Sequence, residues 1–431
     1  VNWGSATQDH TYNYALKFSL DLVDIEEHVK NYRPQILLLS GSPSSRPILV
    51  DFVSCLTKGI SLLTCANIVA EPLDTKTRLR IIRKSYKWLS KRRIRSFYTI
   101  LEANDLEVGS KILLQSLKIN LHQGLSFKII YVICILDFSQ ALTLHVGVAI
   151  LRAQRGFDFS DILKDECYLL EESMSSGIDL AVKDNQKVTP PETPDMNLSN
   201  GKPNFKESIK KEKNKKKTPI YLGIDGKEIS KDLYKKVTIF QGKQKGTIDV
   251  WWLYDDGGLT VLLPYILSTR TQWSGCKLRL FALANREDEL ELEQRSMASL
   301  LSKFRISFND TVIISDVNKK AGQEIQNEFE RTIKKYRNID DNHECRNIEG
   351  YTITDEELSA NREKTNRHLR IRELLLKNSK DAALIVMTLP IPRKNAVSAS
   401  LYMSWLEVLT KEMPPFLFIR GNQTSVLTFY S

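Results

Sequence analysis

The stretch that decides the fold is QILLLSGSPSSRPILVDFVSCLTKGISLLTCANIVA, residues 35–70. It starts with a short apolar run, passes through a Ser-rich loop, enters an amphipathic segment from Pro47 to Lys58 and ends in a second apolar run. This order indicates strand, helix, strand. The basic segment from Lys76 to Arg95 follows with helical spacing, so the pattern is typical of a mostly parallel α/β sheet.

The same alternation continues on both sides of a polar stretch in the middle of the chain. Apolar runs at residues 96–103, 127–138 and 146–153 predict further strands, and a last helix is expected at about residues 159–172. The rhythm restarts with GTIDVWWLYDD at residues 246–256 and ends with PFLFIRGN at residues 415–422. We therefore expect two tandem, doubly wound lobes resembling universal stress proteins, over residues 1–172 and 235–431, with a polar insertion near residues 337–360.

Residues 173–234 differ in character from both lobes. They are rich in Lys, Pro, Asn and Ser and contain few apolar residues. Such a composition buries too little apolar surface to offset the entropy of ordering. The segment is predicted to be a disordered linker, and Thr189-Pro190 and Thr193-Pro194 within it are candidate sites for regulatory kinases or phosphatases.

Composition narrows the classes of protein that fit. Apolar residues make up 42% and charged residues 26% of the chain, which are ordinary globular values. The longest apolar run, residues 127–138, is too short for a bilayer span of about 20 residues. The six cysteines are scattered without a CxxC pair, so a zinc site is not expected and a reducing compartment fits best. The chain begins with Val, which we interpret as the start of a fragment.

The net charge of +10 comes largely from two places, residues 78–95 and the lysine run 210–217. No nucleic-acid-binding signature accompanies them, so we expect no nucleic-acid partner and consider contact with the anionic inner leaflet as an alternative. In the basic helix, Leu79, Ile82, Tyr86 and Leu89 recur at helical spacing. They are predicted to face the sheet, with Arg83, Lys84, Lys87 and Lys91 turned outward.

Two loops carry residues that could support chemistry. Gly41 to Pro47 lies where a strand passes into a helix, the position at which open α/β sheets bind phosphates, but it is not a P-loop or a dinucleotide motif. Pro47 is expected to open the helix. Asp255 and Asp256 follow a strand of the second lobe, but no further ligand completes a metal shell. The histidines stand alone, so no catalytic residue and no metal site are predicted.

Long motifs across the chain resemble the carboxy-terminal cytosolic domain of the sodium-coupled cation-chloride cotransporters. They are VNWGSATQ (1–8), EEHVKNYRPQ (26–35), GTIDVWWLYDDGGLTVLLPYIL (246–267), MASLLSKFRISF (297–308), LYMSWLEVLTK (401–411) and IRGNQTSVLTFYS (419–431). Within the family, NYRPQ, KWLSKRRIRSFY and VTIFQ look closer to the thiazide-sensitive branch than to the bumetanide-sensitive one.

The resemblance implies a non-enzymatic regulatory domain that forms a homodimer and follows its own transmembrane domain at the cytoplasmic face of the plasma membrane. The transport implied is electroneutral symport of chloride with sodium, with or without potassium. Family members can hold a nucleotide in the first lobe, which implies ATP as a regulatory ligand near Leu39, Arg46, Ile68 and Phe157. The alternative function is a nucleotide-binding sensor or enzyme on a universal-stress-protein-like fold.

One stretch departs from the family pattern. Between residues 113 and 146 the chain reads LLQSLKINLHQGLSFKIIYVICILDFSQALTLHV and is shorter than the family sequence. Two outcomes are open: the fourth strand is rebuilt from KIIYVICIL, or the first lobe is damaged there.

Overall fold

The computed structural model describes most of both expected lobes. The described residues are 6–21, 34–58, 61–120, 129–133, 146–153, 156, 158–163, 229–254, 257–283, 295, 299, 301–302, 306–314, 316–337, 352–392 and 396–421. Contacts divide the chain into one unit of Val1–Phe159 with Lys235–Ser431 and a second of Ser160–Tyr234. The fold described below is that of the first unit.

The first half of this unit alternates strands and helices as the apolar runs predict. Its elements are α1 (Ala6–Asp21), β1 (Gln35–Leu39), α2 (Pro47–Thr57), β2 (Leu63–Val69), α3 (Thr75–Lys91), β3 (Phe97–Glu102), α4 (Leu106–Asn120), β4 (Ile129–Ile133) and β5 (Gly147–Arg152).

The second half repeats the alternation with more helices. Its elements are α7 (Lys231–Val237), β6 (Gly246–Trp252), α8 (Leu259–Ser268), β7 (Cys276–Leu283), β8 (Asp310–Ile314), η4 (Asp316–Asn318), α10 (Gln323–Ile333), η5 (Lys334–Tyr336), α11 (Asp355–Ala360), α12 (Arg362–Ser379), β9 (Leu384–Thr388), α13 (Ala399–Thr410) and β10 (Phe416–Arg420).

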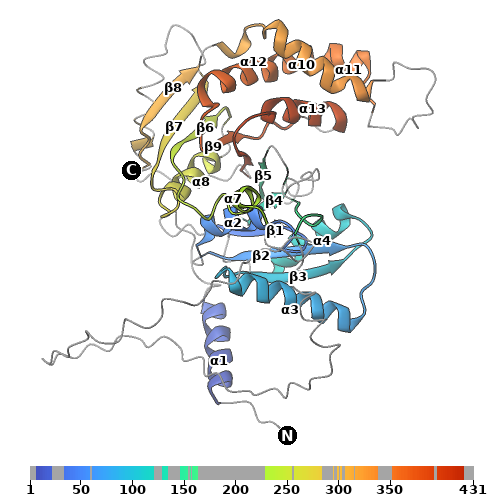
Figure 1. Ribbon diagram of the computed structural model, residues 1–431, viewed down its shortest axis with the longest axis vertical. Coiled ribbons are helices and arrows are strands. Elements are labelled where there is room, and N and C mark those ends of the chain that lie inside the picture. Colours follow the sequence, from blue (N-terminus) through green and yellow to red (C-terminus); the bar gives the residue numbers. More distant parts are fainter. Residues whose placement is uncertain are drawn as a thin grey trace, which may run out of the picture. The chain divides into compact units, whose positions relative to one another are not determined.

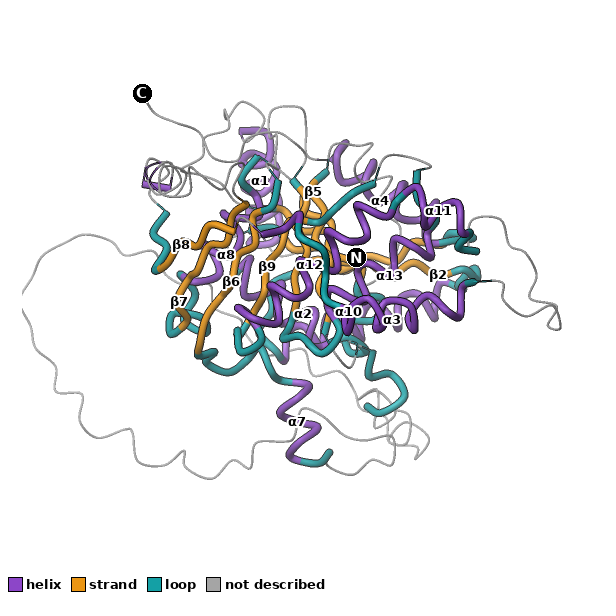
Figure 2. The backbone as a smooth tube through the Cα atoms, turned by 90° about the horizontal axis from the view of Figure 1, so that it is seen from above, coloured by secondary structure: helices purple, strands orange, loops and turns teal. Residues whose placement is uncertain are grey.

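The strands of the two halves join in one ten-stranded sheet. Their order is β3-β2-β1-β4-β5-β10-β9-β6-β7-β8 (Figures 1 and 2). The pairs within each half are parallel, whereas β10 runs antiparallel to β5. The mostly parallel α/β class is confirmed. The two lobes expected in sequence thus share a continuous sheet through the β5–β10 pair.

Helices cover both faces of this sheet. In β1, Leu37 and Leu39 belong to the core cluster that includes Leu113 and Leu114 of α4. Ile36 and Leu38 alternate with them and point to the opposite face of the sheet. The same cluster contains apolar residues of α10, α12 and α13, which Figure 1 shows beside β6, β7 and β9. α2 and α8 contact each other as well as their own strands. Because both faces are covered, the central strands β1, β5, β9 and β10 are buried and largely apolar.

Side chains of the two halves also meet beside α2. Phe52 of α2 packs against Phe240 and Trp273, with ring centroids 5.0 and 6.3 Å away. Arg270 donates to the carbonyl of Leu56 at 2.8 Å. These apolar and polar contacts supplement the β5–β10 pairing.

A buried ion pair lies next to this aromatic cluster. Arg92, which caps the end of α3, is 1% exposed and pairs with Asp51 of α2, which is 7% exposed. Gln241 of the second half donates to the same Asp51 carboxylate at 3.2 Å. The carboxylate therefore links three segments. Burial raises the pKa of Asp51, opposed by the charge of Arg92 and by the hydrogen bonds from Arg92 and Gln241.

The buried face predicted for α3 was wrong in part. Trp88 and Leu89 are 7% and 1% exposed, whereas Leu79 and Tyr86 are 46% and 41% exposed. The reason is that α3 packs on β3, the edge strand. Because the sheet ends at β3, it covers only a narrow strip of the helix. The bulky Trp88 occupies that strip, and Leu79 lies outside it.

Other local expectations can be compared with the structure directly. Residues 160–162 form a turn rather than the start of a helix at 159–172, and the rest of that segment lies outside the described residues. The helix α1 was not predicted. Most of the expected linker 173–234 and of the insertion near 337–360 also lies outside the described residues, so those domain bounds stay predictions.

Candidate functional site

The loop after β1 is placed where an open α/β sheet binds ligands. β1 has β2 on one side and β4 on the other: the connection after β1 leads to β2, and the connection after β3 reverses direction and crosses back past β1 to β4. Ligands of such sheets lie at the carboxyl ends of the strands flanking this reversal. Residues 40–47 occupy that end of β1.

Short contacts fix the conformation of the loop. Gly41 has a φ of +62°, and its N–H donates to the Ala66 carbonyl of β2 at 3.1 Å. A Cβ at this position would lie 3.1 Å from Nη1 of Arg46, so glycine suits both the backbone angle and the close approach. Pro47 opens α2 as predicted, with Arg46 as the N-cap residue. The loop is a tight turn held against β2.

Arg46, the predicted phosphate ligand, already has two partners. Its Nη1 donates to the Ser40 carbonyl at 2.9 Å, and its Nη2 pairs with Asp158 at 3.0 Å. Asp158 is 51% exposed, so solvent weakens this ion pair. An anionic ligand would have to compete with Asp158 for the guanidinium.

The apolar residues predicted to contact a nucleotide lie in neighbouring strands. Leu39 ends β1 and is 8% exposed, and Ile68 of β2 packs against the same core cluster. α4 approaches Ile68 closely: a Cβ added at Gly109 would be 2.6 Å from Cγ2 of Ile68. Phe157 lies outside the described residues. The structure thus brings Leu39 and Ile68 under α4, and whether they bind a nucleotide stays a prediction.

The divergent stretch of the first half contains a fourth strand. β4, from Ile129 to Ile133, pairs in parallel with β1 on one side and β5 on the other. Of the two outcomes left open by the sequence, the described residues support a rebuilt strand. Residues 121–128 and 134–145 lie outside the described residues.

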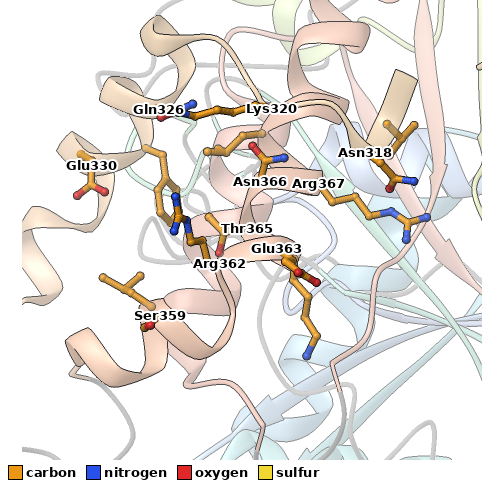
Figure 3. Close-up of a pocket in the computed structure, with 15 residues that line it drawn as sticks. Asn318, Lys320, Gln326, Glu330, Ser359, Arg362, Glu363, Thr365, Asn366 and Arg367 are labelled. Atoms are coloured by element: carbon orange, nitrogen blue, oxygen red, sulfur yellow. The ribbon is translucent and has the colours of Figure 1, made fainter. Parts of the chain in front are cut away.

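A second candidate site is a pocket of about 940 Å³ in the second half, which sequence reasoning missed. Its walls come from the segment after β8 and from α10, α11 and the first two turns of α12 (Figure 3). Asn366 fixes one wall, because its side chain donates to the Lys319 carbonyl at 3.0 Å and accepts from the Ala321 N–H at 2.9 Å.

The pocket has a mixed charge. Four basic and two acidic side chains line it: Lys320, Arg362, Lys364, Arg367, Glu330 and Glu363. Arg367 stacks over Tyr254 at 5.4 Å, and Lys364 donates to Asn361 at 3.3 Å. The density of basic residues in 362–372 was the one sequence signal for it. The lining suits a polar solute with both signs of charge.

Two buried titratable groups of the second half contact other side chains of the fold. Asp249 pairs with Arg279 across β6 and β7, and His368 stacks on Trp405. Within the described ranges, no group of His, Cys, Asp and Glu side chains could hold a metal ion. Asp255 and Asp256 lie outside the described residues. Asp249 and His368 make an ion pair and a packing contact, and we assign them no catalytic role.

Comparison with known proteins gives the family. The profile described as solute carrier family 12 matches residues 46–120 and 131–431. The bumetanide-sensitive sodium-(potassium)-chloride cotransporter of Manduca sexta is 40% identical, with all of this chain and 44% of that protein aligned. Human solute carrier family 12 member 2 is 37% identical, with 100% and 38% aligned, and rat member 1 is 39% identical, with 100% and 41% aligned.

The chain therefore belongs to solute carrier family 12, as the motifs predicted, and spans less than half the length of these relatives. The comparisons leave the branch of the family undecided. A solved structure, the cytoplasmic domain of a prokaryotic cation chloride cotransporter, aligns with 92% of this chain and 99% of its own at a TM-score of 0.42 and 9% identity. Among the described helices, none has the length and hydropathy to cross a bilayer.

Proposed function

We propose that this chain is the cytosolic regulatory and dimerisation part of an electroneutral sodium-coupled chloride symporter, at the cytoplasmic face of the plasma membrane. The observation that carries the proposal is sequence identity along the whole chain: 40% to the Manduca sexta sodium-(potassium)-chloride cotransporter and 37% to human solute carrier family 12 member 2.

A flux assay on the full-length protein tests the symport. Chloride uptake is measured in cells with sodium and potassium removed in turn. We expect uptake to fall when sodium is removed, and the effect of removing potassium assigns the second cation. Uptake that is unchanged without sodium would contradict the proposal.

Exposed apolar side chains on α1 support a contact with a partner. Tyr12, Leu16 and Leu20 lie four residues apart on one side of the helix and are 67%, 48% and 59% exposed. Rows of exposed apolar residues mark interaction surfaces. A second copy of the chain or its own transmembrane domain could bury this row, and we propose the homodimer.

Sedimentation equilibrium of the chain at micromolar concentrations tests the dimer. Replacing Leu16 and Leu20 with Glu is expected to weaken dimerisation by about a hundredfold or more, because each change removes roughly 1.5–3 kcal/mol of apolar burial. Lys17→Glu, at an exposed position of the same helix outside the row, is the matched control. A strict monomer in the unmodified chain would contradict self-association through these residues.

We also propose ATP as a regulatory ligand of the loop 40–47. The position of the loop beside β4 supports this, as does the guanidinium of Arg46 at the start of α2. Isothermal titration should show ATP binding that Arg46→Ala abolishes, with no hydrolysis above background. Asp158→Asn is the informative control, since it frees Arg46 and should tighten binding. Hydrolysis would favour the alternative of an enzyme.

Regulation by kinases or phosphatases at Thr189 or Thr193 remains a prediction, since both residues lie outside the described residues. Mass spectrometry of the protein from its native cells, with and without phosphatase treatment, checks it. Both threonines unmodified under all conditions would contradict it.

A further inference from the structure

Every charged residue in the segment from Thr75 to Arg95 is basic. The segment contains ten basic residues and no Asp or Glu: Lys76, Arg78, Arg80, Arg83, Lys84, Lys87, Lys91, Arg92, Arg93 and Arg95. Two of them serve the fold. Arg78 contacts Glu102 and the Ile100 carbonyl, and Arg92 pairs with Asp51.

Four of the others form a continuous surface, the α3 basic face. Lys76, Arg80, Arg83 and Lys87 are three or four residues apart, so they share one side of α3, and all four are exposed. The buried side of α3 carries Ser85, Trp88 and Leu89. The basic face is therefore turned away from the sheet and held there by the packing of Trp88.

Apolar side chains border this face. Leu79 and Tyr86 lie along its edge at 46% and 41% exposure. The Tyr86 hydroxyl accepts from the Tyr98 N–H at 3.2 Å, which keeps the tyrosine ring near β3. Cations interleaved with exposed aliphatic and aromatic groups are typical of helices that lie in a lipid interface.

We propose that the α3 basic face docks on an anionic lipid surface. The cations would attract the lipid headgroups, and Leu79 and Tyr86 would enter the boundary between headgroups and acyl chains. The inference relies on the proposed membrane location of the parent protein, but not on its dimer or on transport. Lipid is favoured over nucleic acid or an acidic protein because Leu79 and Tyr86 offer apolar surface that a phosphate backbone or a carboxylate cluster would not bury.

The test is co-sedimentation of the 431-residue chain with vesicles. One set is phosphatidylcholine alone, and the other contains about 30% phosphatidylserine, a fraction that gives a negative surface potential. Binding is expected only to the anionic set, and it should weaken as salt shortens the Debye length. Replacing Arg80, Arg83 and Lys87 together with Glu should weaken binding about a hundredfold or more, since each cation near the surface contributes roughly fivefold.

The matched control replaces Lys243, Lys245 and Lys377, exposed residues elsewhere, with Glu. It changes the net charge equally and should keep binding within a few-fold. Leu79→Ser should weaken binding to anionic vesicles while leaving its salt dependence in place. Circular dichroism and sedimentation confirm that each variant is folded and keeps its oligomeric state, which separates failure here from failure of the proposed dimer.

Three results would overturn the proposal. The first is no binding of the unmodified chain to anionic vesicles. The second is equal loss in the α3 variant and the lysine control, which would indicate a general charge effect. The third is retention on duplex DNA or polyglutamate with vesicles unbound, which would assign the face to one of those partners.

Discussion

His368 is a histidine held neutral by its surroundings. Its side chain is buried in α12, Nδ1 lies 2.7 Å from the Lys364 carbonyl, and the ring stacks on Trp405 with centroids 4.6 Å apart. The pKa of His368 is lowered from the ordinary 6.5 to about 4, chiefly by burial and also by the nearby charges of Arg367 and Lys364. The carbonyl contact opposes this shift.

This pKa predicts loss of stability in mild acid. The unfolded chain takes up a proton at pH values where the folded chain does not, so the His368 contribution is full above pH 6.5 and falls as the pH approaches 4. By pH 5 about 2 kcal/mol should be lost. His368→Phe keeps a ring against Trp405 but cannot titrate, so urea unfolding at pH 8 and pH 5 should show a smaller drop in the variant. An equal drop would contradict the assignment.

Asp249 is a fully buried carboxylate that depends on one partner. It is 0% exposed, and Arg279 on the neighbouring strand meets it through Nε at 2.8 Å and Nη2 at 2.5 Å. The same Nη2 reaches the Asn378 carbonyl at 2.8 Å. The carboxylate raises the pKa of Arg279, chiefly through this hydrogen bonding.

Arg279→Leu is expected to destabilise the protein by about 3–5 kcal/mol, because it leaves a buried charge without compensation. Lys277→Leu, an exposed position on the same face of β7, should change stability by less than about 0.5 kcal/mol. Chemical denaturation with both variants checks this. A cost for Arg279→Leu as small as that of the control would contradict the dependence of Asp249 on Arg279.

At the scale of single elements, local patterns predicted most of the described helices and strands. Apolar runs gave the strands because a buried parallel strand needs several apolar residues in succession, and start signals such as Pro47 and Thr354 lie where α2 and α11 begin. Thr354 and Glu357 have the spacing of a capping box, which is half formed. Thr354 accepts from the Glu357 N–H, but the Glu357 carboxylate accepts from the Ser398 N–H.

Ser398 is the N-cap residue of α13, and its Oγ accepts from the Leu401 N–H at 3.2 Å. Ser398→Ala should lower the free energy of unfolding by about 1 kcal/mol, since a helix N–H loses its partner. Ser398→Thr retains the oxygen and should cost a few tenths at most. Thermal unfolding of the two variants compares them, and equal midpoints would show that the cap contributes nothing.

What the sequence did not predict depends on partners distant in the chain. The exposure of Leu79 follows from β3 being an edge strand, which spacing along α3 does not reveal. The pocket near Asn366 forms where three helices meet, and the pairing of β10 with β5 joins residues more than 250 positions apart. For the candidate nucleotide site, the sequence predicted the loop and the start of α2 at Pro47. It did not predict the pairing of Arg46 with Asp158.

At the scale of the whole molecule, several contacts connect the two halves. They are the β5–β10 ladder, the cluster of Phe52, Phe240 and Trp273, and the carboxylate of Asp51 held by Arg92 and Gln241. Most are buried, so each costs free energy to separate. The halves should therefore behave as one cooperative body.

Cleavage within residues 173–234 tests this. With a protease site introduced after Ser199, the two fragments should remain together in native gel filtration and separate in urea, because the contacts between the halves do not need the covalent link. Phe418→Pro removes a ladder hydrogen bond from β10 and should let the fragments separate. Fragments that part without denaturant would show two independent domains.

β10 lies in the middle of the sheet but late in the sequence, so its pairing with β5 comes late in synthesis. β5 is complete once residue 152 has been made, but its neighbour on that side comes from residues 416–420. At ribosomal rates of about 5–20 residues per second, the interval is on the order of tens of seconds. Throughout it, a strand of apolar residues would present unpaired N–H and C=O groups, a template for aggregation. The last of the described strands to be made is thus the one that covers this exposed edge of the nascent chain.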